Sequence, residues 1–441
     1  MKKYSKYKIA GVDWLDDVPS HWTIMRATNY CKQNKKDNSK QKETNLLSLS
    51  YGKIVRKDIE TSFGLLPASF ANYQIVDTGY IIFRLTDLQN DKRSLRVGFC
   101  GEKGIITSAY LGLIFDKRID RKYCFYLFYS YDIKKVFYSQ GGSMRQSMKF
   151  DDFKTIPILI PPLEEQTTIA KYLDTKTQAI DKKINLLTQK AETYKELRKS
   201  IINDAVCKGL EKKVKLKESV YVFKVNENWK RYRLKDLGFL YSGLSGKAGD
   251  DFNQEENPNT KSFIPFTNIA NNTYLDIKQV GSVVMAENEK QNKVRKGDLF
   301  FLMSSEGYED VGKTAALAEE MKDTYLNSFC KGYRITKNFC EPYFLNYLLL
   351  SDNYRKSLIT EGKGFTRINL KMEKVTDFFV YLPPTKEEQT AISNYLDEKT
   401  QKIDAIVSNM GKQIDTLKEL RKTLINDVVT GKIKVVTNGN K

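Results

Sequence analysis

The chain has 441 residues, of which 41% are hydrophobic and 12% aromatic, so it is too long for one ordinary domain and too apolar to be largely disordered. Its 73 Lys and Arg against 54 Asp and Glu give a net charge of +19, which favours a polyanionic partner such as nucleic acid. Six scattered cysteines without C-x-x-C pairs and a single histidine exclude a zinc-finger or disulfide scaffold.

The first part of the chain, residues 1–160, is predicted to form a domain of mixed α and β structure. It opens on a segment rich in Lys and Tyr, and no stretch of the chain approaches the roughly 20 apolar residues of a membrane helix. We therefore expect no secretory signal, no membrane segment and a cytoplasmic location. Tyr80–Phe83 predicts a buried strand, residues 124–137 a helix and residues 156–160 a closing strand.

Two polar loops of this domain carry side chains suited to contacting DNA. The first loop follows the predicted strand at Tyr80–Phe83, and the second contains glycines beside polar side chains. Arginine suits guanine edges or phosphates, and Asp or Asn suits cytosine or adenine edges. The alternative is that each loop is only a polar turn. The candidate DNA contacts of this domain are Arg84, Asp87, Lys92, Arg93, Ser94, Arg96, Arg145 and Gln146.

Residues 161–210 predict a long helix with a narrow apolar seam. A Pro-Pro pair precedes it, two glutamates lie in its first turn where the helix dipole favours them, and Gly209 ends it. Apolar residues recur every seven positions with alternating spacings of three and four, which is typical of a coiled coil. The 43 residues from Glu164 to Val206 would span about 65 Å at about 1.5 Å per residue. The predicted pairing residues are Leu173, Ile180, Leu187, Tyr194 and Ile201.

Residues 211–382 predict a second mixed domain with the same skeleton as the first. Strands are expected at Asp298–Leu302 and at residues 378–382, and a helix at residues 343–358. Its loops differ in sequence from those of the first domain, which indicates the same kind of task performed on a different target. The candidate DNA contacts are Ser304, Ser305, Glu306, Tyr308, Lys313, Lys363, Arg367 and Asn369.

One segment of the second domain also matches a phosphate-binding loop. Residues 307–314 satisfy the pattern G-x-x-x-x-G-K-[ST] and follow a predicted strand, so backbone amides and Lys313 could cradle phosphates. However, Glu306, Glu309 and Asp310 would repel a triphosphate, and the first domain has no Lys-Thr at the equivalent place. We interpret the match as a turn and keep a nucleotide-binding enzyme as the alternative.

Residues 383–433 repeat the first long helix, and a short tail follows at residues 434–441. Glu387-Glu388-Gln389-Thr390 repeats Glu164-Glu165-Gln166-Thr167, and one constant shift in numbering relates the rest of the two helices. Thr385 to Glu388 has the spacing of a capping box, and Gly431 is expected to end the helix. The predicted pairing residues are Leu396, Ile403, Met410, Leu417 and Leu424.

The matching seams predict that the two long helices pair within the chain. An antiparallel pairing is favoured, because a parallel one would force the linker between Lys208 and Asn228 to run back along the rod almost fully extended. The predicted fold class is α+β, with two mixed α/β domains joined by an antiparallel coiled coil in a pseudo-two-fold tandem repeat. The alternative is two separate amphipathic helices, each packed on its own domain.

This order of domain, helix, domain and near-identical helix resembles the DNA specificity subunit of a type I restriction–modification system. The resemblance rests on the pattern Pro-Pro-x-E-E-Q-x-x-I-x-x-Y-L-D from Pro161, on its repeat from Pro383, and on the helix ends Leu197 to Asp204 and Leu420 to Asp427. The lead-in from Gly11 to Trp22 also matches, so the resemblance covers essentially the whole chain.

The resemblance implies two target-recognition domains, each reading one half of an asymmetric, bipartite DNA site, with the paired helices setting the gap between the halves. It also implies docking of methyltransferase subunits, expected to be two, and of restriction–translocase subunits, also expected to be two. Family members do not perform catalysis themselves. S-adenosylmethionine, ATP and Mg²⁺ are therefore expected on the partner subunits, with no cofactor or metal on this chain.

The residues themselves also predict a binder rather than an enzyme. His21 is the only histidine and lies beside Trp22, where it is more typical of a packing residue than of a catalytic base. No glycine-rich cofactor loop follows a predicted strand in the manner of dinucleotide-binding domains. The remaining alternative is a coiled-coil scaffold on DNA without a methyltransferase partner.

Overall fold

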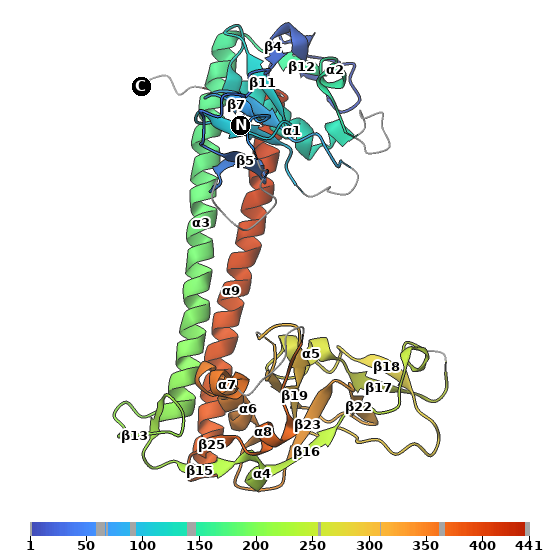
Figure 1. Cartoon of the computed structure of the whole chain (residues 1–441), viewed down its shortest axis with the longest axis vertical. Coiled ribbons are helices and arrows are strands. Elements are labelled where there is room, and N and C mark those ends of the chain that lie inside the picture. Colours follow the sequence, from blue (N-terminus) through green and yellow to red (C-terminus); the bar gives the residue numbers. More distant parts are fainter. Residues whose placement is uncertain are drawn as a thin grey trace. The chain divides into compact units, whose positions relative to one another are not determined.

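The computed structural model describes residues 2–58, 67, 69–88, 94–138, 147–254, 257–308, 310–360 and 367–436. The chain divides into two compact units, Met1–Thr188 with Gly411–Lys441, and Gln189–Met410 (Figure 1). The two predicted long helices are present as α3 (Leu163–Lys208) and α9 (Lys386–Val429). Each unit contains one end of each helix, and we call the rest of each unit the first head and the second head.

The first head is built around a four-stranded antiparallel sheet with the order β4-β11-β8-β9. A separate pair, β3 and β12, joins the strand after Trp22 to the strand that leads into α3. The strands are β1 (Tyr7–Lys8), β2 (Val18–Pro19), β3 (Thr23–Arg26), β4 (Cys31–Gln33), β5 (Leu47–Ser50), β6 (Lys53–Arg56), β7 (Gln74–Val76), β8 (Ile81–Phe83), β9 (Val97–Phe99), β10 (Gly104–Ile106), β11 (Leu111–Phe115) and β12 (Pro157–Ile160). The helices are α1 (Arg121–Ile133) and α2 (Phe150–Phe153), with 3-10 turns at Ala27–Asn29 and Val136–Tyr138.

The second head repeats this design, with a four-stranded antiparallel sheet of order β16-β23-β19-β21 and a closing pair β15-β25. It adds a three-stranded sheet, β18-β17-β22. The strands are β13 (Leu216–Glu218), β14 (Lys224–Asn226), β15 (Lys230–Arg233), β16 (Gly238–Ser242), β17 (Thr260–Ile264), β18 (Gly281–Val284), β19 (Leu299–Leu302), β20 (Ser304–Ser305), β21 (Thr314–Ala316), β22 (Thr324–Leu326), β23 (Cys330–Ile335), β24 (Ile368–Asn369) and β25 (Phe379–Leu382). The helices are α4 (Leu234–Leu237), α5 (Phe266–Asn271), α6 (Pro342–Leu350), α7 (Asp352–Ile359) and α8 (Met372–Thr376), with a 3-10 turn at Gly249–Asp251.

Each head packs on both long helices. In the first unit the core joins Trp22 and Phe128 of the head to Leu173 near the start of α3 and Val428 near the end of α9. The core of the second unit is built in the same way, with residues from the end of α3 and the start of α9. The alternative of two separate helices, each packed on its own domain alone, is therefore wrong.

The two long helices are antiparallel, as predicted. In the first unit Arg421 of α9 forms an ion pair with Asp181 of α3, with an Nε–Oδ1 distance of 3.0 Å. In the second unit Arg198 of α3 forms an ion pair with Asp404 of α9, also at 3.0 Å. In both cases the early part of one helix meets the late part of the other, and α3 and α9 lie side by side within each unit (Figure 1). Because Arg421 and Asp404 are the repeat counterparts of Arg198 and Asp181, the two pairs are equivalent.

Burial along both helices follows one narrow face. Between Lys182 and Ser200 of α3, all residues except five are exposed. The partly buried residues there are Ile184, Leu187, Ala191, Tyr194 and Arg198. Between Lys402 and Leu420 of α9, the residues that are not exposed are Ile403, Val407, Met410, Ile414 and Leu417. This spacing of three and four residues is what pairing of two helices along one narrow face requires.

The repeated glutamine of each helix attaches the head to the helix. The buried Gln166 accepts a hydrogen bond from the backbone N–H of Asp120, at the start of α1, and donates one to the carbonyl of Pro161, both at 2.8 Å. Gln389 makes the equivalent two contacts in the second unit. The repeated glutamine of the Glu-Glu-Gln motif therefore has a structural explanation within each unit.

The repeated Asp and Thr that follow have the same attaching role. The hydroxyl of Tyr126 donates to Asp174 at 2.6 Å and lies 3.1 Å from the hydroxyl of Thr177. Tyr347 makes the same two contacts, at 2.7 and 3.2 Å, with the corresponding Asp and Thr of α9. The repeated residues of α3 and α9 therefore attach each head in the same way, although the loops of the two heads differ in sequence.

Candidate nucleic-acid interface

In the second head, the two loops predicted to contact DNA meet. β20 follows β19 directly and pairs antiparallel with β24, which places Ser304 opposite Asn369. In the same region Met303 accepts a backbone hydrogen bond from Leu370 at 2.8 Å. Segments that are far apart in the sequence therefore form one surface. The predicted DNA contacts in these two segments need to lie on one surface if they are to touch the same DNA.

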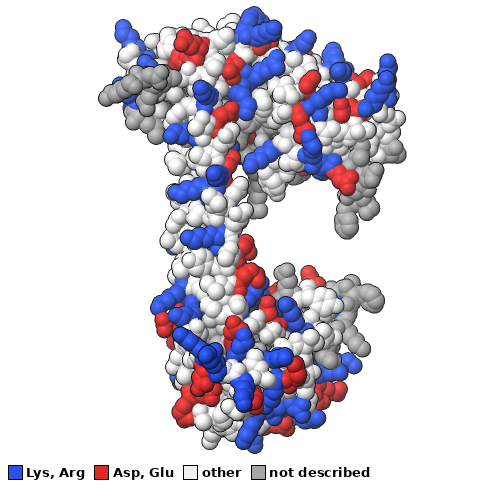
Figure 2. Space-filling view, turned by 90° about the vertical axis from the view of Figure 1, so that its left-hand side faces the viewer, with Lys and Arg blue, Asp and Glu red and all other residues white. Residues whose placement is uncertain are grey.

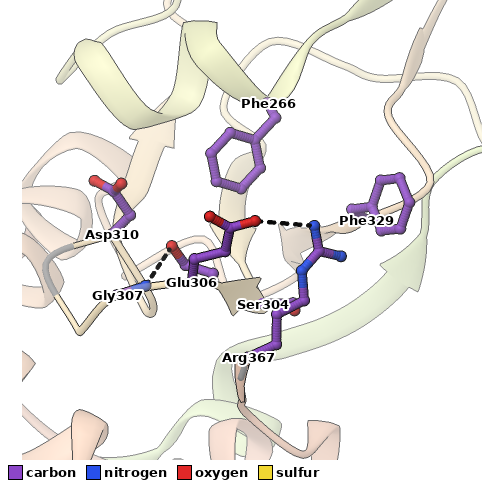
Figure 3. Close-up of a pocket in the computed structure, with 8 residues that line it drawn as sticks. Phe266, Ser304, Glu306, Gly307, Asp310, Phe329 and Arg367 are labelled. Atoms are coloured by element: carbon purple, nitrogen blue, oxygen red, sulfur yellow. Dashed lines mark hydrogen bonds and ion pairs between the residues drawn. The ribbon is translucent and has the colours of Figure 1, made fainter. Parts of the chain in front are cut away.

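A pocket of about 390 Å³ opens beside this pair of strands. Glu306 and Arg367 lie next to each other in its lining, with an Oε1–Nη2 distance of 3.9 Å (Figure 3). The ring of Phe329 lies 5.9 Å from the guanidinium carbon of Arg367. The lining residues are Phe266, Ser304, Ser305, Glu306, Gly307, Asp310, Phe329 and Arg367.

The segment that matched a phosphate-binding loop lies between β19 and β21, which pair as an antiparallel hairpin. A phosphate-binding loop leads into a helix, whereas Thr314 is buried in β21, which pairs with β19, and its hydroxyl donates to Asn346 at 2.8 Å. The ammonium of Lys313 is held by Asp310 at 2.7 Å and by the carbonyl of Ala270 at 3.1 Å. Tyr308 is exposed at the tip of this hairpin. The geometry supports the interpretation of a turn.

In the first head, a backbone contact joins the described residues next to the two predicted loops in the same way. The backbone N–H of Met148 donates to the carbonyl of Leu85 at 2.9 Å, as Leu370 does to Met303 in the second head. Asp87 is exposed and has a φ of +58°, while Arg84 and Ser94 are half-buried. Lys92, Arg93, Arg145 and Gln146 of this head, and Lys363 of the second, lie outside the described residues.

Arg96 does not have the geometry of a DNA contact. Its side chain is buried, and its guanidinium donates to the carbonyls of Thr86 at 2.9 Å and Asp87 at 3.1 Å. Its own backbone N–H donates to the carboxylate of Asp132. These contacts argue against the prediction that Arg96 touches DNA and indicate that it shapes the loop that carries Asp87.

Several side chains at these surfaces were not predicted from the sequence. In the first head a hollow of about 900 Å³ beside Thr86 and Met148 is also lined by Lys32, Lys35 and Lys149. In the second head the missed residues are Phe266 and Phe329. Phe329 is 60% exposed, and large exposed aromatic side chains often mark binding surfaces, but this exposure could not be read from the sequence.

The net positive charge does not by itself locate the interface. On the face shown in Figure 2, Lys and Arg side chains are intermixed with Asp and Glu over both units. In the part of the chain that the structure describes, no cluster of His, Cys, Asp and Glu could hold a metal ion. Among the same residues, no helix is both long and apolar enough to cross a membrane.

Solved structures share this fold over nearly its whole length. A structure from a study of complex assembly and conformational transition of the type I R-M system matches 94% of this chain and 99% of its own, with a TM-score of 0.70 and 17% sequence identity. The HsdS subunit from Thermoanaerobacter tengcongensis matches 94% and 98%, with a TM-score of 0.52 and 16% identity.

Sequence comparisons point in the same direction. The type I restriction enzyme MjaVIII specificity subunit of Methanocaldococcus jannaschii is 25% identical over 442 aligned residues, which cover 95% of this chain and 94% of that protein. The family described as the type I restriction modification DNA specificity domain matches residues 77–189 and 226–416, together more than half of the chain. The chain therefore belongs to the family of type I restriction–modification DNA specificity domains and carries that domain twice.

Proposed function

We propose that the chain is the non-catalytic subunit that gives a type I restriction–modification complex its DNA sequence specificity. In this proposal each head reads one half of an asymmetric, bipartite target in double-stranded DNA. The observation that carries it is the contrast between scaffold and loops. Both heads have the same sheet order and are mounted by the same hydrogen bonds, yet the converging loops present different side chains. Two unlike readers on a repeated scaffold suit a target with two unlike halves.

We further propose that α3 and α9 set the length of the unspecified DNA between the half-sites and dock the methyltransferase subunits. The motifs repeated near both ends of the two helices support this proposal, since two copies of one partner need two equivalent surfaces. Leu197 and Leu420 are equivalent in the repeat, and their exposed fractions are 46% and 51%. A single exposed leucine says little, but the same one on both helices suits a contact with the same partner twice.

The other parts of the proposal concern the partner subunits. Two methyltransferase and two restriction–translocase subunits would complete the assembly, and S-adenosylmethionine, ATP and Mg²⁺ would bind there. The complex would act in the cytoplasm, where chromosomal DNA lies.

Methylation maps of cells with and without this chain, each expressing the partner methyltransferase, test the proposal. We expect one bipartite, asymmetric methylated sequence that appears only with the chain, and copurification of the methyltransferase with it. An unchanged methylation map would refute the proposal. Binding or hydrolysis of ATP by the purified chain would instead favour the nucleotide-binding alternative.

A further inference from the structure

The pocket of the second head holds a donor and an acceptor side by side. Arg367 directly precedes β24, and Glu306 directly follows β20, so the pairing of these two strands fixes both side chains on one side of the pocket. The fractions of the Glu306 and Arg367 side chains that are exposed are 84% and 56%. An ion pair this exposed contributes little to stability, so both groups can turn to a ligand at small cost.

One feature makes this pocket unsuited to a phosphate, and a second favours the edge of a base. The carboxylates of Glu306 and Asp310 both line it, and negative charge there repels the DNA backbone. The ring of Phe329 flanks Arg367, and an aromatic face beside a guanidinium holds its plane and adds apolar surface. Both features suit the edge of a base pair, which is flat and carries donors as well as acceptors.

The order of the two groups matches one kind of base pair. Along the major groove a G·C pair presents two neighbouring acceptors, guanine N7 and O6, and then the cytosine N4 amino donor. A guanidinium fork spans the two acceptors, and an adjacent carboxylate accepts from the amino group. An A·T pair presents an acceptor, a donor and an acceptor, which leaves the fork without its second acceptor and sets the carboxylate against the O4 of thymine.

We propose that Arg367 and Glu306 together read one G·C base pair through its major-groove edge, Arg367 at guanine and Glu306 at cytosine. The pairing of β20 with β24 sets the spacing of the two groups, and Phe329 keeps the guanidinium on the pocket side. This assignment rests on the proposed function, because it requires the second head to lie on DNA.

The variants Arg367→Lys and Glu306→Gln test it in the complex of full-length chain and methyltransferase. Lysine keeps the positive charge but lacks the paired N–H donors of the guanidinium. The affinity for unrelated DNA and its salt dependence should therefore stay the same. Discrimination at one G·C pair of the target should fall by about tenfold to a hundredfold. The amide of glutamine offers both a donor and an acceptor, so Glu306→Gln should lower the discrimination at the same base pair.

The measurement is a methylation map for each variant, followed by binding to duplexes in which each base pair of the second half-site is replaced in turn. Glu319→Gln removes an exposed carboxylate of the same head outside the pocket lining and should leave the map unchanged. Loss of discrimination at the same G·C pair in both variants, with recognition of the first half-site unchanged, supports the proposal. Maps unchanged in both variants, or relaxation at two different pairs, overturn it. A wild-type chain that has no effect on methylation overturns the proposed function instead.

Discussion

Gln389 shows how one buried side chain joins a head to its helix. Its carbonyl oxygen accepts from the backbone N–H of Glu341 at 2.9 Å, and its amide donates to the carbonyls of Phe339 at 3.0 Å and Pro383 at 3.2 Å. All of these partners are backbone groups, so the contact does not depend on the side chains of the head. This explains why the glutamine is the same in both repeats although the heads differ.

We predict that Gln389→Ala lowers the free energy of unfolding of the second unit by about 3 kcal/mol, because it leaves buried backbone groups without partners. Chemical denaturation of the full-length chain measures this change. Gln401→Ala, at an exposed position of the same helix, is the matched control and should change the value by less than about 0.5 kcal/mol. Equal effects of the two variants would contradict the attaching role.

Asp132 links the stability of the first head to pH. Burial raises the pKa of its carboxyl to about 6, against an ordinary value of 3.8, although the backbone N–H of Arg96 donates to it. The folded state therefore binds a proton at a higher pH than the unfolded state does. Stability is gained as the pH falls through about 6 toward 3.8, and this gain is lost as the pH rises again.

We predict that the contribution of Asp132 grows by about 1 kcal/mol between about pH 7.5 and about pH 5.5. Asp132→Asn should remove this part of the pH dependence, because an amide does not titrate in this range. Denaturation curves of wild type and variant at both pH values give the comparison. The same pH dependence in both proteins would show that the carboxyl of Asp132 does not titrate differently in the folded and unfolded states.

Among the elements, the long helices were predicted best and the short ones less well. The helix expected at residues 124–137 is α1, which starts earlier because the side chain of Asp120 accepts from two backbone N–H groups at 2.9 Å and caps it. It ends at Ile133, before Lys135, whose φ is +61°. The helix expected at residues 343–358 is divided into α6 and α7 at Ser351, which has extended backbone angles.

The two long helices can be lengthened without changing how they pair. We predict that a heptad inserted after Gln189 in α3 and another after Lys412 in α9, which are equivalent positions of the repeat, keeps the seam in register. Seven residues add about 10 Å. The unspecified gap in the DNA target should widen by about three base pairs while both half-sites stay the same. The methylation map of the variant is the measurement, and an unchanged gap would exclude the helices as the spacer.

For the whole molecule, the repeat separates what is common to the two units from what is specific to each. The sheet order, the closing strand pair and the mounting contacts are common. The converging loops differ, with lysines around the hollow of the first head and two acidic residues, an arginine and two phenylalanines around the pocket of the second. In the proposed function, the loops of one unit can therefore change without changing how either head is attached to the helices.

We predict that replacing residues 23–160 with the matching part of another family member changes one half-site only. The exchanged part carries the loops of the first head but none of the residues of α3 or α9. A methylation map of the chimera should show a new first half, the same second half and the same gap. A change in both halves would contradict the independence of the two heads.

The sequence by itself determined the repeat, the two paired helices with their seam, and the family, since these depend on local periodicity and on motifs that can be read along the chain. Only the tertiary structure decided which polar residues form a surface. The pairing of β20 with β24 unites Glu306 with Arg367, while Arg96 is buried and Lys313 is held by Asp310. The physical reason is that a loop side chain takes its partners from segments distant in the sequence, and no local pattern records which segments will meet.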